Sequence, residues 1–300
     1  MTFEKIISIL YDGLDSGKIK HGENLNVESG FIFWRDALLE KVCRIFEWHG
    51  LPFEQKNIEL ATIINGFCGF TFDNGYNDYI AVVGGLSGVT PFPDVYTDFT
   101  YASPKCSGGT KPIYPYNDFG LVVIIDNTTC RNSLLPLIER YARLLAHSDA
   151  TIRGALINAR YNSYMIAEND STRESMIEWR KSVEDGEIKP IVNKSLTTDT
   201  PIIPISDTNK GNLILQSIEA RENILRMFYN DIGIRKNKDK RGNMVVDEVA
   251  QDDMSLLFNI SDMLKQRKYA CENINKLYGL NVSVKLSDEY NSLDAYDGDN

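Results

Sequence analysis

The chain has 300 residues, of which 43% are hydrophobic and 25% are charged. These proportions are typical of a globular protein with a sizeable core, and they exclude wholesale disorder. The formal net charge of −10 excludes a protein that binds nucleic acid over its whole surface, because such proteins are basic. Any contact with nucleic acid must therefore be local.

The cysteines indicate a reducing compartment. They are dispersed, odd in number and without a C-x-x-C pair: Cys43, Cys68, Cys106, Cys130 and Cys271. This pattern predicts reduced thiols in a cytosol, with no disulfide framework and no zinc site. The first ten residues lack a basic start and a long apolar run, and no stretch reaches the length of apolar sequence that spans a bilayer. We therefore expect neither a signal peptide nor a membrane-spanning helix.

The first third of the chain predicts helices followed by a β-unit. Residues 1–28 mix both charges with several glycines and predict a partly flexible segment. From Ser29 to Phe46 apolar residues recur at three- and four-residue steps, which predicts a helix that ends before Gly50. Asn57 is expected to cap a shorter helix that ends at Gly66.

Residues 67–126 are rich in glycine, proline and aromatic residues. Short β-rich runs at 69–72, 79–83 and 121–125 predict a small twisted β-unit, with a hairpin turn at Asn74-Gly75. The glycine-rich run 84–88 is interpreted as a β-turn, since no Lys-Ser/Thr follows to make a phosphate loop. The run 107–111 is interpreted as a flexible loop.

Two long helices around an insertion are predicted next. The first begins near Asn132, tolerates Pro136 in its first turn and runs to about residue 160. The second follows Thr208 and ends at Gly233. The insertion, with β-like runs at 188–192 and 202–205, is expected to be a compact β-rich appendage. A last helix over 254–278 and a strand over 280–286 precede an acidic tail, predicted to be disordered.

The sequence offers no catalytic or metal-binding set. His21, His49 and His147 are isolated, and none has the spacing of metal ligands. We interpret His49 and His147 as residues near helix C-termini, where a positive charge is favourable. A Cys–His nucleophile pair meets only in space, and Cys106 with His147 is the one candidate pair. We therefore expect no enzyme, no cofactor and no metal.

The segment 235–241 is the most basic part of the chain. Its five positive side chains face one Asp239, which leaves a net charge of +4: Arg235, Lys236, Lys238, Lys240 and Arg241. One interpretation is a solvated loop between helices. The other is a contact to DNA phosphates, which needs no sequence reading. Repeated around a ring, such a loop becomes a positive collar.

Three stretches of the sequence resemble the portal proteins, also called upper-collar or connector proteins, of small short-tailed phages with protein-primed DNA replication. The first stretch contains Phe46-Glu47-Trp48, Leu51-Pro52, Gly66-Phe67 and Gly69-Phe70. The second contains Tyr79-Ile80-Ala81, Gly85-Leu86-Ser87-Gly88, Asp94-Val95-Tyr96 and Ala102-Ser103-Pro104. The third contains Met244-Val245, Asp247-Glu248-Val249 and the run from Ala270 to Val282.

The resemblance implies an α+β subunit with two long stem helices, a β-rich clip insertion, and a wing of helices with a small β-barrel-like unit. The implied parts are a wing at 29–129 and 248–286, stem helices at 130–160 and 208–232, a clip at 161–207, and a channel loop at 233–247. Residues 1–28 would precede the wing, and 287–300 would form the acidic tail.

The resemblance also implies a function: a ring of about twelve subunits at one capsid vertex. The ring would be a conduit for packaging and ejection of double-stranded DNA, without sequence specificity. Its implied partners are the major capsid protein, a lower-collar or tail protein and a packaging ATPase, with assembly in the cytoplasm of a bacterial host. Besides the channel loop, the implied DNA contacts of the clip and stem are Lys189, Lys194 and Lys210.

Two departures and two alternatives limit this interpretation. Related proteins begin with a strongly basic arm linked to a packaging RNA, whereas residues 1–28 are near neutral, so RNA binding is not carried over. Where relatives have a lysine inside the second stem helix, this chain has Gln216. One alternative is another ring-forming tail or collar adaptor. The other is a cytosolic enzyme with a cysteine nucleophile, which predicts a reactive Cys106 or Cys130.

Overall fold

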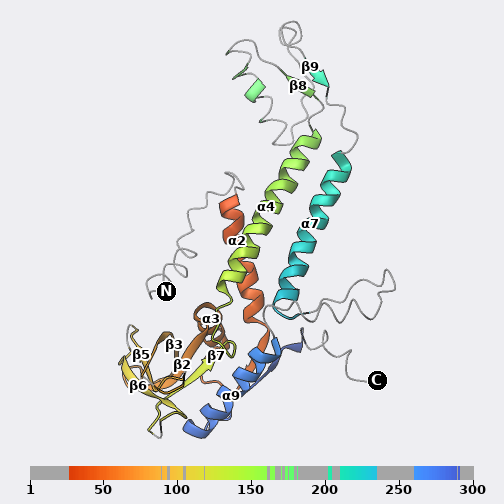
Figure 1. Ribbon diagram of the computed structural model, residues 1–300. Coiled ribbons are helices and arrows are strands. Elements are labelled where there is room, and N and C mark those ends of the chain that lie inside the picture. The colour runs from red at the N-terminus through yellow and green to blue at the C-terminus, as the bar shows by residue number, and fades with distance from the viewer. Residues whose placement is uncertain are drawn as a thin grey trace, which may run out of the picture.

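A computed structural model describes residues 27–88, 90–92, 95–103, 106–117, 119–160, 163–165, 202–204, 210–234 and 260–288, with short pieces at 170, 173–174, 176–178, 181 and 290. Three long helices lie side by side: α2 (Val27–Cys43), α4 (Leu135–Arg160) and α7 (Lys210–Asp231) (Figure 1). A sheet and helix α9 (Ile260–Tyr278) lie at one end of this layer. The strand pair β8 (Ser163–Met165) and β9 (Ile202–Pro204) lies at the other end.

Helix α4 is the central member of the layer, in contact with α2 and α7. Its start is fixed by Ser133, whose Oγ accepts a hydrogen bond from the Leu135 amide at 3.1 Å, so the predicted start near Asn132 is confirmed to within three residues. Helices α2 and α4 approach closely, because a Cβ added at Gly30 would lie 3.3 Å from the Cβ of Ala146. The long helical hairpin of the prediction is thus present as α4 and α7.

The predicted helix ending before Gly50 is too long. Helix α2 ends at Cys43, and strand β1 (Phe46–His49) follows and pairs antiparallel with β10 (Ser283–Leu286), so that Phe46 faces Leu286. Helix α3 (Gln55–Asn65) begins two residues before Asn57, after Glu54, and ends at Gly66 in the left-handed conformation, as predicted. His49 therefore lies in a strand and His147 inside α4, neither near a helix C-terminus.

The β-unit is a six-stranded sheet in the order β3-β2-β7-β6-β5-β4. The strands are β2 (Phe67–Asp73), β3 (Asp78–Val82), β4 (Gly84–Ser87), β5 (Asp98–Tyr101), β6 (Gly109–Tyr114) and β7 (Val122–Asp126). Strands β3 and β4 form opposite edges, yet only Val83 separates them in the chain. The two edges must therefore come close together, which curls the sheet into a half-barrel and agrees with the expected barrel-like unit.

Two interpretations of this unit are wrong. The run 84–88 is no β-turn, because Gly84–Ser87 is strand β4, paired with β5. The run 107–111 is no loop throughout, because β6 begins at Gly109. The hairpin between β2 and β3 is where it was predicted, but its turn spans 74–77 and its left-handed residue is Asn77, with φ 57°.

Helix α9 covers strand β7 of the half-barrel and contacts strand β10. It ends at Gly279, as predicted, with φ 66°. The largest cluster of buried side chains runs continuously through these parts. It includes Leu38 of α2, Phe70 of β2, Ile138 of α4, Phe228 of α7 and Ile274 of α9. One shared core therefore makes the helical layer, the sheet and α9 a single body.

Candidate functional site

Polar contacts fix the three long helices relative to one another. The Asp149 carboxylate of α4 accepts a hydrogen bond from Nε1 of Trp34 in α2 at 2.6 Å and lies 3.4 Å from Nη1 of Arg221 in α7. Farther along the pair, the Tyr141 hydroxyl donates to Oδ2 of Asp231, the last residue of α7. Burial and then this carboxylate raise the pKa of Tyr141 to about 12, so the hydroxyl stays protonated and donates. Together these contacts hold α7 at its middle and at its end.

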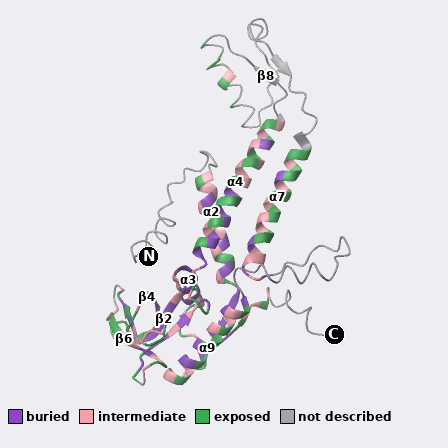
Figure 2. Cartoon of the chain, in the orientation of Figure 1, coloured by how far each residue is buried: buried purple, intermediate pink, exposed green. Residues whose placement is uncertain are grey.

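Helices α4 and α7 have many exposed residues along their length (Figure 2), and several of these are large and apolar. On α4, Leu144 is 42% exposed and lies one turn from the exposed Arg140. On α7, Leu213 is 52% and Met227 is 53% exposed. These two residues are fourteen positions apart, which places them on one side of the helix. Exposed large apolar residues in such stripes are typical of a surface that another protein covers.

Buried residues anchor both ends of the segment that contains the basic run. After α7, Ile232 is 1% and Ile234 is 5% exposed, and where the chain is described again, Ile260 is 6% and Met263 is 1% exposed. All four belong to the same core cluster. The described residues that directly precede and follow the segment 235–259 are therefore fixed in the core.

The predicted DNA-contacting residues are largely outside the described part of the chain. This holds for Arg235, Lys236, Lys238, Lys240 and Arg241, and also for Lys189 and Lys194. Lys210 is the first residue of α7, at the end of that helix nearest β8 and β9 (Figure 1); its side chain is not described. The structure therefore does not test this assignment, which stays a prediction.

A buried ion pair, which the sequence did not reveal, connects helix α3 to helix α9. Arg267 of α9 and Glu59 of α3 are both fully buried and form two hydrogen bonds, Nε to Oε1 at 2.9 Å and Nη2 to Oε2 at 2.8 Å. Glu59 Oε1 also accepts from Trp48 Nε1 at 2.7 Å. Arg267 further donates to Asn127 and lies 4.1 Å from the centre of the Phe46 ring.

This network ties together four segments that are far apart in the chain: α3, α9, strand β1 and the turn after β7. A charged pair in a dry interior is stable only when its remaining donors and acceptors are also matched. Here Trp48 and Asn127 supply those matches. The arrangement fits a structural role, because both charged groups are hydrogen-bonded to buried partners and neither faces an open cavity.

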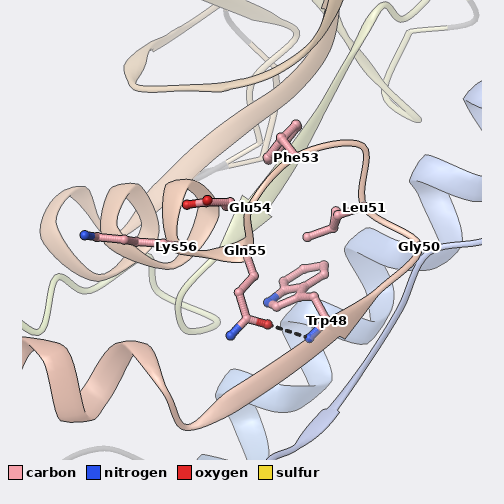
Figure 3. Close-up of a pocket in the computed structure, with 7 residues that line it drawn as sticks. All are labelled: Trp48, Gly50, Leu51, Phe53, Glu54, Gln55 and Lys56. Carbon is pink, nitrogen blue, oxygen red and sulfur yellow. Dashed lines mark hydrogen bonds between the residues drawn. The ribbon is translucent and has the colours of Figure 1, made fainter.

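A surface hollow of about 430 Å³ lies where β1 passes into α3 (Figure 3). Its lining is Trp48, Gly50, Leu51, Phe53, Glu54, Gln55 and Lys56. The Gln55 side chain accepts from the Trp48 amide at 3.0 Å and donates to the Phe46 carbonyl, so it covers the free edge of β1. The lining has no Cys, Ser or His, so the hollow lacks a nucleophile with a base.

The cysteines do not form an activated site. Burial raises the pKa of the Cys43, Cys68 and Cys271 thiols to about 12, which disfavours the reactive thiolate. Cys106 lies in the connection between β5 and β6, His147 lies in α4, and the structure records no hydrogen bond between these two described residues. Within the described residues, no cluster of His, Cys, Asp or Glu is arranged to hold a metal ion. No described helix has the length and apolar character needed to cross a bilayer.

The comparisons with known proteins agree with the resemblance seen in the sequence. Three solved chains illustrate the similarity. One, from the portal and tail of native bacteriophage P68, has 14% identity and a TM-score of 0.47, over 99% of this chain and 96% of that one. Another, from the virion of a native gene transfer agent particle, has 10% identity and a TM-score of 0.44, over 97% and 86%.

The third is an HK97 family phage portal protein from Corynebacterium diphtheriae, with 12% identity and a TM-score of 0.38, over 90% of this chain and 95% of that one. The family model described as Phage Connector (GP10) matches residues 15–291, which is most of the chain. The family is one of structural proteins. The chain therefore belongs to the phage connector family and is a structural subunit of a phage portal.

Proposed function

We propose that this connector subunit forms a ring of about twelve copies at one capsid vertex, and that the ring is the conduit for DNA during packaging and ejection. Family membership is the observation that carries this proposal. The described structure supports it with a stiff helical layer whose outer surfaces are apolar and exposed. In this arrangement α4 and α7 are the stem, β8 and β9 belong to the clip, and the half-barrel with α2, α3 and α9 is the wing.

The outer surface of α4 carries an exposed arginine, and that of α7 carries exposed glutamates beside the exposed Arg226, so unlike charges can meet in a head-to-tail contact between neighbouring copies. On α4, the exposed Arg140 accompanies Leu144. On α7, the exposed Glu219 and Glu222 accompany Leu215, which is 61% exposed. A contact between unlike surfaces repeats around a ring until it closes. Arg143 is also exposed on α4, and its guanidinium lies 4.4 Å from the centre of the Phe31 ring in α2 of the same chain.

The ring is tested by light scattering and negative-stain imaging of the purified protein. We expect particles with a central hole and a mass of about a dozen subunits. Arg140→Glu should shift the protein toward smaller species, and Glu219→Arg in the same chain should restore rings. Lys265→Glu, on the exposed side of α9, is the matched control and should leave the rings intact. A monomer or dimer at every salt concentration would contradict the proposal.

The segment 235–241 is proposed to contact the DNA in the channel. Its net charge of +4 within a chain of net charge −10 supports a weak, local contact with phosphates that does not depend on base sequence. Weak contact suits translocation, because a tightly binding collar would stall the DNA. Lys189, Lys194 and Lys210 are proposed as further contacts of the clip and stem. Energy for translocation would come from a separate packaging ATPase bound at the clip, 161–207.

The loop is tested by replacing Arg235, Lys236, Lys238, Lys240 and Arg241 with Ala. We expect intact rings with a loss of DNA packaging or retention. The control replaces five exposed lysines of the wing helices and so removes the same charge: Lys41, Lys56, Lys265, Lys268 and Lys276. Packaging that survives the loop variant unchanged, or that falls equally in the control, would rule out a specific role of the loop.

A further inference from the structure

A buried amide at the contact between α9 and the half-barrel lacks a hydrogen-bond partner among the described residues. Asn273 of α9 is 4% exposed. Its side chain makes no hydrogen bond with any residue that the structure describes, although the next asparagine along the helix does. Asn275 bonds directly to the Val282 backbone through both of its polar atoms, at 2.7 and 2.8 Å. Buried amide groups are rarely left unsatisfied, because leaving them so costs a lost hydrogen bond to water.

Asn273 lines a small hollow between α9 and the sheet, with a free volume of about 20 Å³. A volume of this size is enough for about one water molecule. The other side chains of the lining that carry polar groups are Asp126 at the end of β7, Arg131, and four tyrosines: Tyr96, Tyr114, Tyr116 and Tyr269. The hollow is therefore too small for an organic ligand and too polar to remain dry.

The charges in this hollow are already balanced. Arg131 Nε donates to Asp126 Oδ1 at 2.8 Å, so the carboxylate has a cation beside it. Its second oxygen, Oδ2, accepts no hydrogen bond from the described residues. A neutral molecule that donates one hydrogen bond and accepts another satisfies both Asp126 and Asn273, whereas a metal ion would be repelled by Arg131.

We propose that this hollow holds one ordered water molecule that bridges the Asn273 amide to the Asp126 carboxylate. The water connects α9 to β7 at the point where the helix covers the sheet. It is a structural component of the wing, and it explains why a polar residue occupies a buried position in a helix whose neighbouring buried residues, Ala270 and Ile274, are apolar.

The direct test is a structure of the assembled protein at a resolution that shows other buried waters. We expect a density peak within hydrogen-bonding distance, roughly 2.6–3.2 Å, of Asn273 and of Asp126. The same peak should be absent from Asn273→Leu, in which an apolar side chain of similar size offers the water no hydrogen bond. A hollow that is empty in the wild type overturns the proposal. So does an anomalous peak at the site after exchange into a thallium salt, because that identifies a monovalent cation.

Thermal unfolding provides a second readout with a matched control. Asn273→Leu removes the amide together with the water and leaves only Asp126 Oδ2 without its proposed donor, so it should lower the melting temperature less than Asn275→Leu does. Asn275→Leu should lower it by several degrees, because two direct bonds to the Val282 backbone are lost. Equal losses in the two variants would show that Asn273 makes a direct protein contact, which overturns the water bridge.

Discussion

Replacing Arg267 by Met tests whether the buried ion pair with Glu59 holds helix α9 to helix α3. Arg267 and Glu59 are both fully buried, and the pair makes two hydrogen bonds of 2.8 and 2.9 Å. Methionine keeps much of the side-chain length but leaves Glu59 buried with only the Trp48 indole as a donor. Removing one partner of a buried pair costs about 3–5 kcal/mol of unfolding free energy. We expect Arg267→Met to lose that amount in chemical denaturation of the purified protein.

The double variant Arg267→Met with Glu59→Leu separates charge from packing. It removes both charges, so it should recover much of the stability that the single variant loses, since apolar replacements of a buried pair are often close to neutral. A control at the exposed Lys268, the next residue of α9, should change the unfolding free energy by less than about 0.5 kcal/mol. A single variant as stable as the wild type, or a double variant no better than the single one, would refute this role of the pair.

Three further predictions concern the half-barrel and the helical layer. Burial raises the pKa of Asp73, but hydrogen bonds from Ser107, Tyr101 and backbone amides outweigh it and hold the pKa below its usual range. The stability that this carboxylate adds is therefore present above about pH 4 and is lost as the pH falls further. Asp73→Asn should lower the melting temperature at pH 6 and make the melting temperature less dependent on pH in acid. Tyr141→Phe removes the hydrogen bond to Asp231 and should cost about 1–3 kcal/mol in chemical denaturation, whereas the same change in an Asp231→Asn background should cost less. At Gly66 the backbone φ is +86° and an added Cβ would lie 2.0 Å from a backbone oxygen, so Gly66→Ala should prevent folding or lower the melting temperature strongly. The control Gly154→Ala lies in open space inside α4 and should raise the unfolding free energy by about 0.5–1 kcal/mol. Stable folding of Gly66→Ala would contradict the assigned backbone conformation.

The helices could be predicted from the sequence because their signals are local. Gly66, Gly233 and Gly279 were expected to end helices, and each has a positive φ in the structure. The two helices α4 and α7 follow from apolar residues repeated every three or four positions, together with the Ser133 cap. Such signals lie within one or two turns of chain, so they do not depend on distant partners.

The strands were harder to predict because their partners are distant or their residues are unusual for strands. Phe46 and Trp48 continue the apolar spacing of the preceding helix, yet they pair with β10 at the other end of the chain. Strand β4 begins with two glycines, which normally weaken a strand; it forms because β5 pairs with it along its whole length. Glu59 and Arg267 are 208 positions apart, and no local pattern shows that they meet.

Variants of the buried Arg267–Glu59 pair and variants of the basic segment 235–241 should affect different properties, the first the stability of the subunit and the second DNA packaging. Both ends of 235–259 are held by buried residues, Ile234 and Ile260, which belong to the same core as α9. Changes of charge inside that segment should therefore alter DNA packaging and leave the melting temperature unchanged. Arg267→Met should do the reverse in the isolated subunit, because it weakens the packing of α9 and leaves the loop sequence intact. If the loop variant also lowered the melting temperature by several degrees, the basic residues would belong to the folded frame, and a loss of packaging could no longer be attributed to DNA contact.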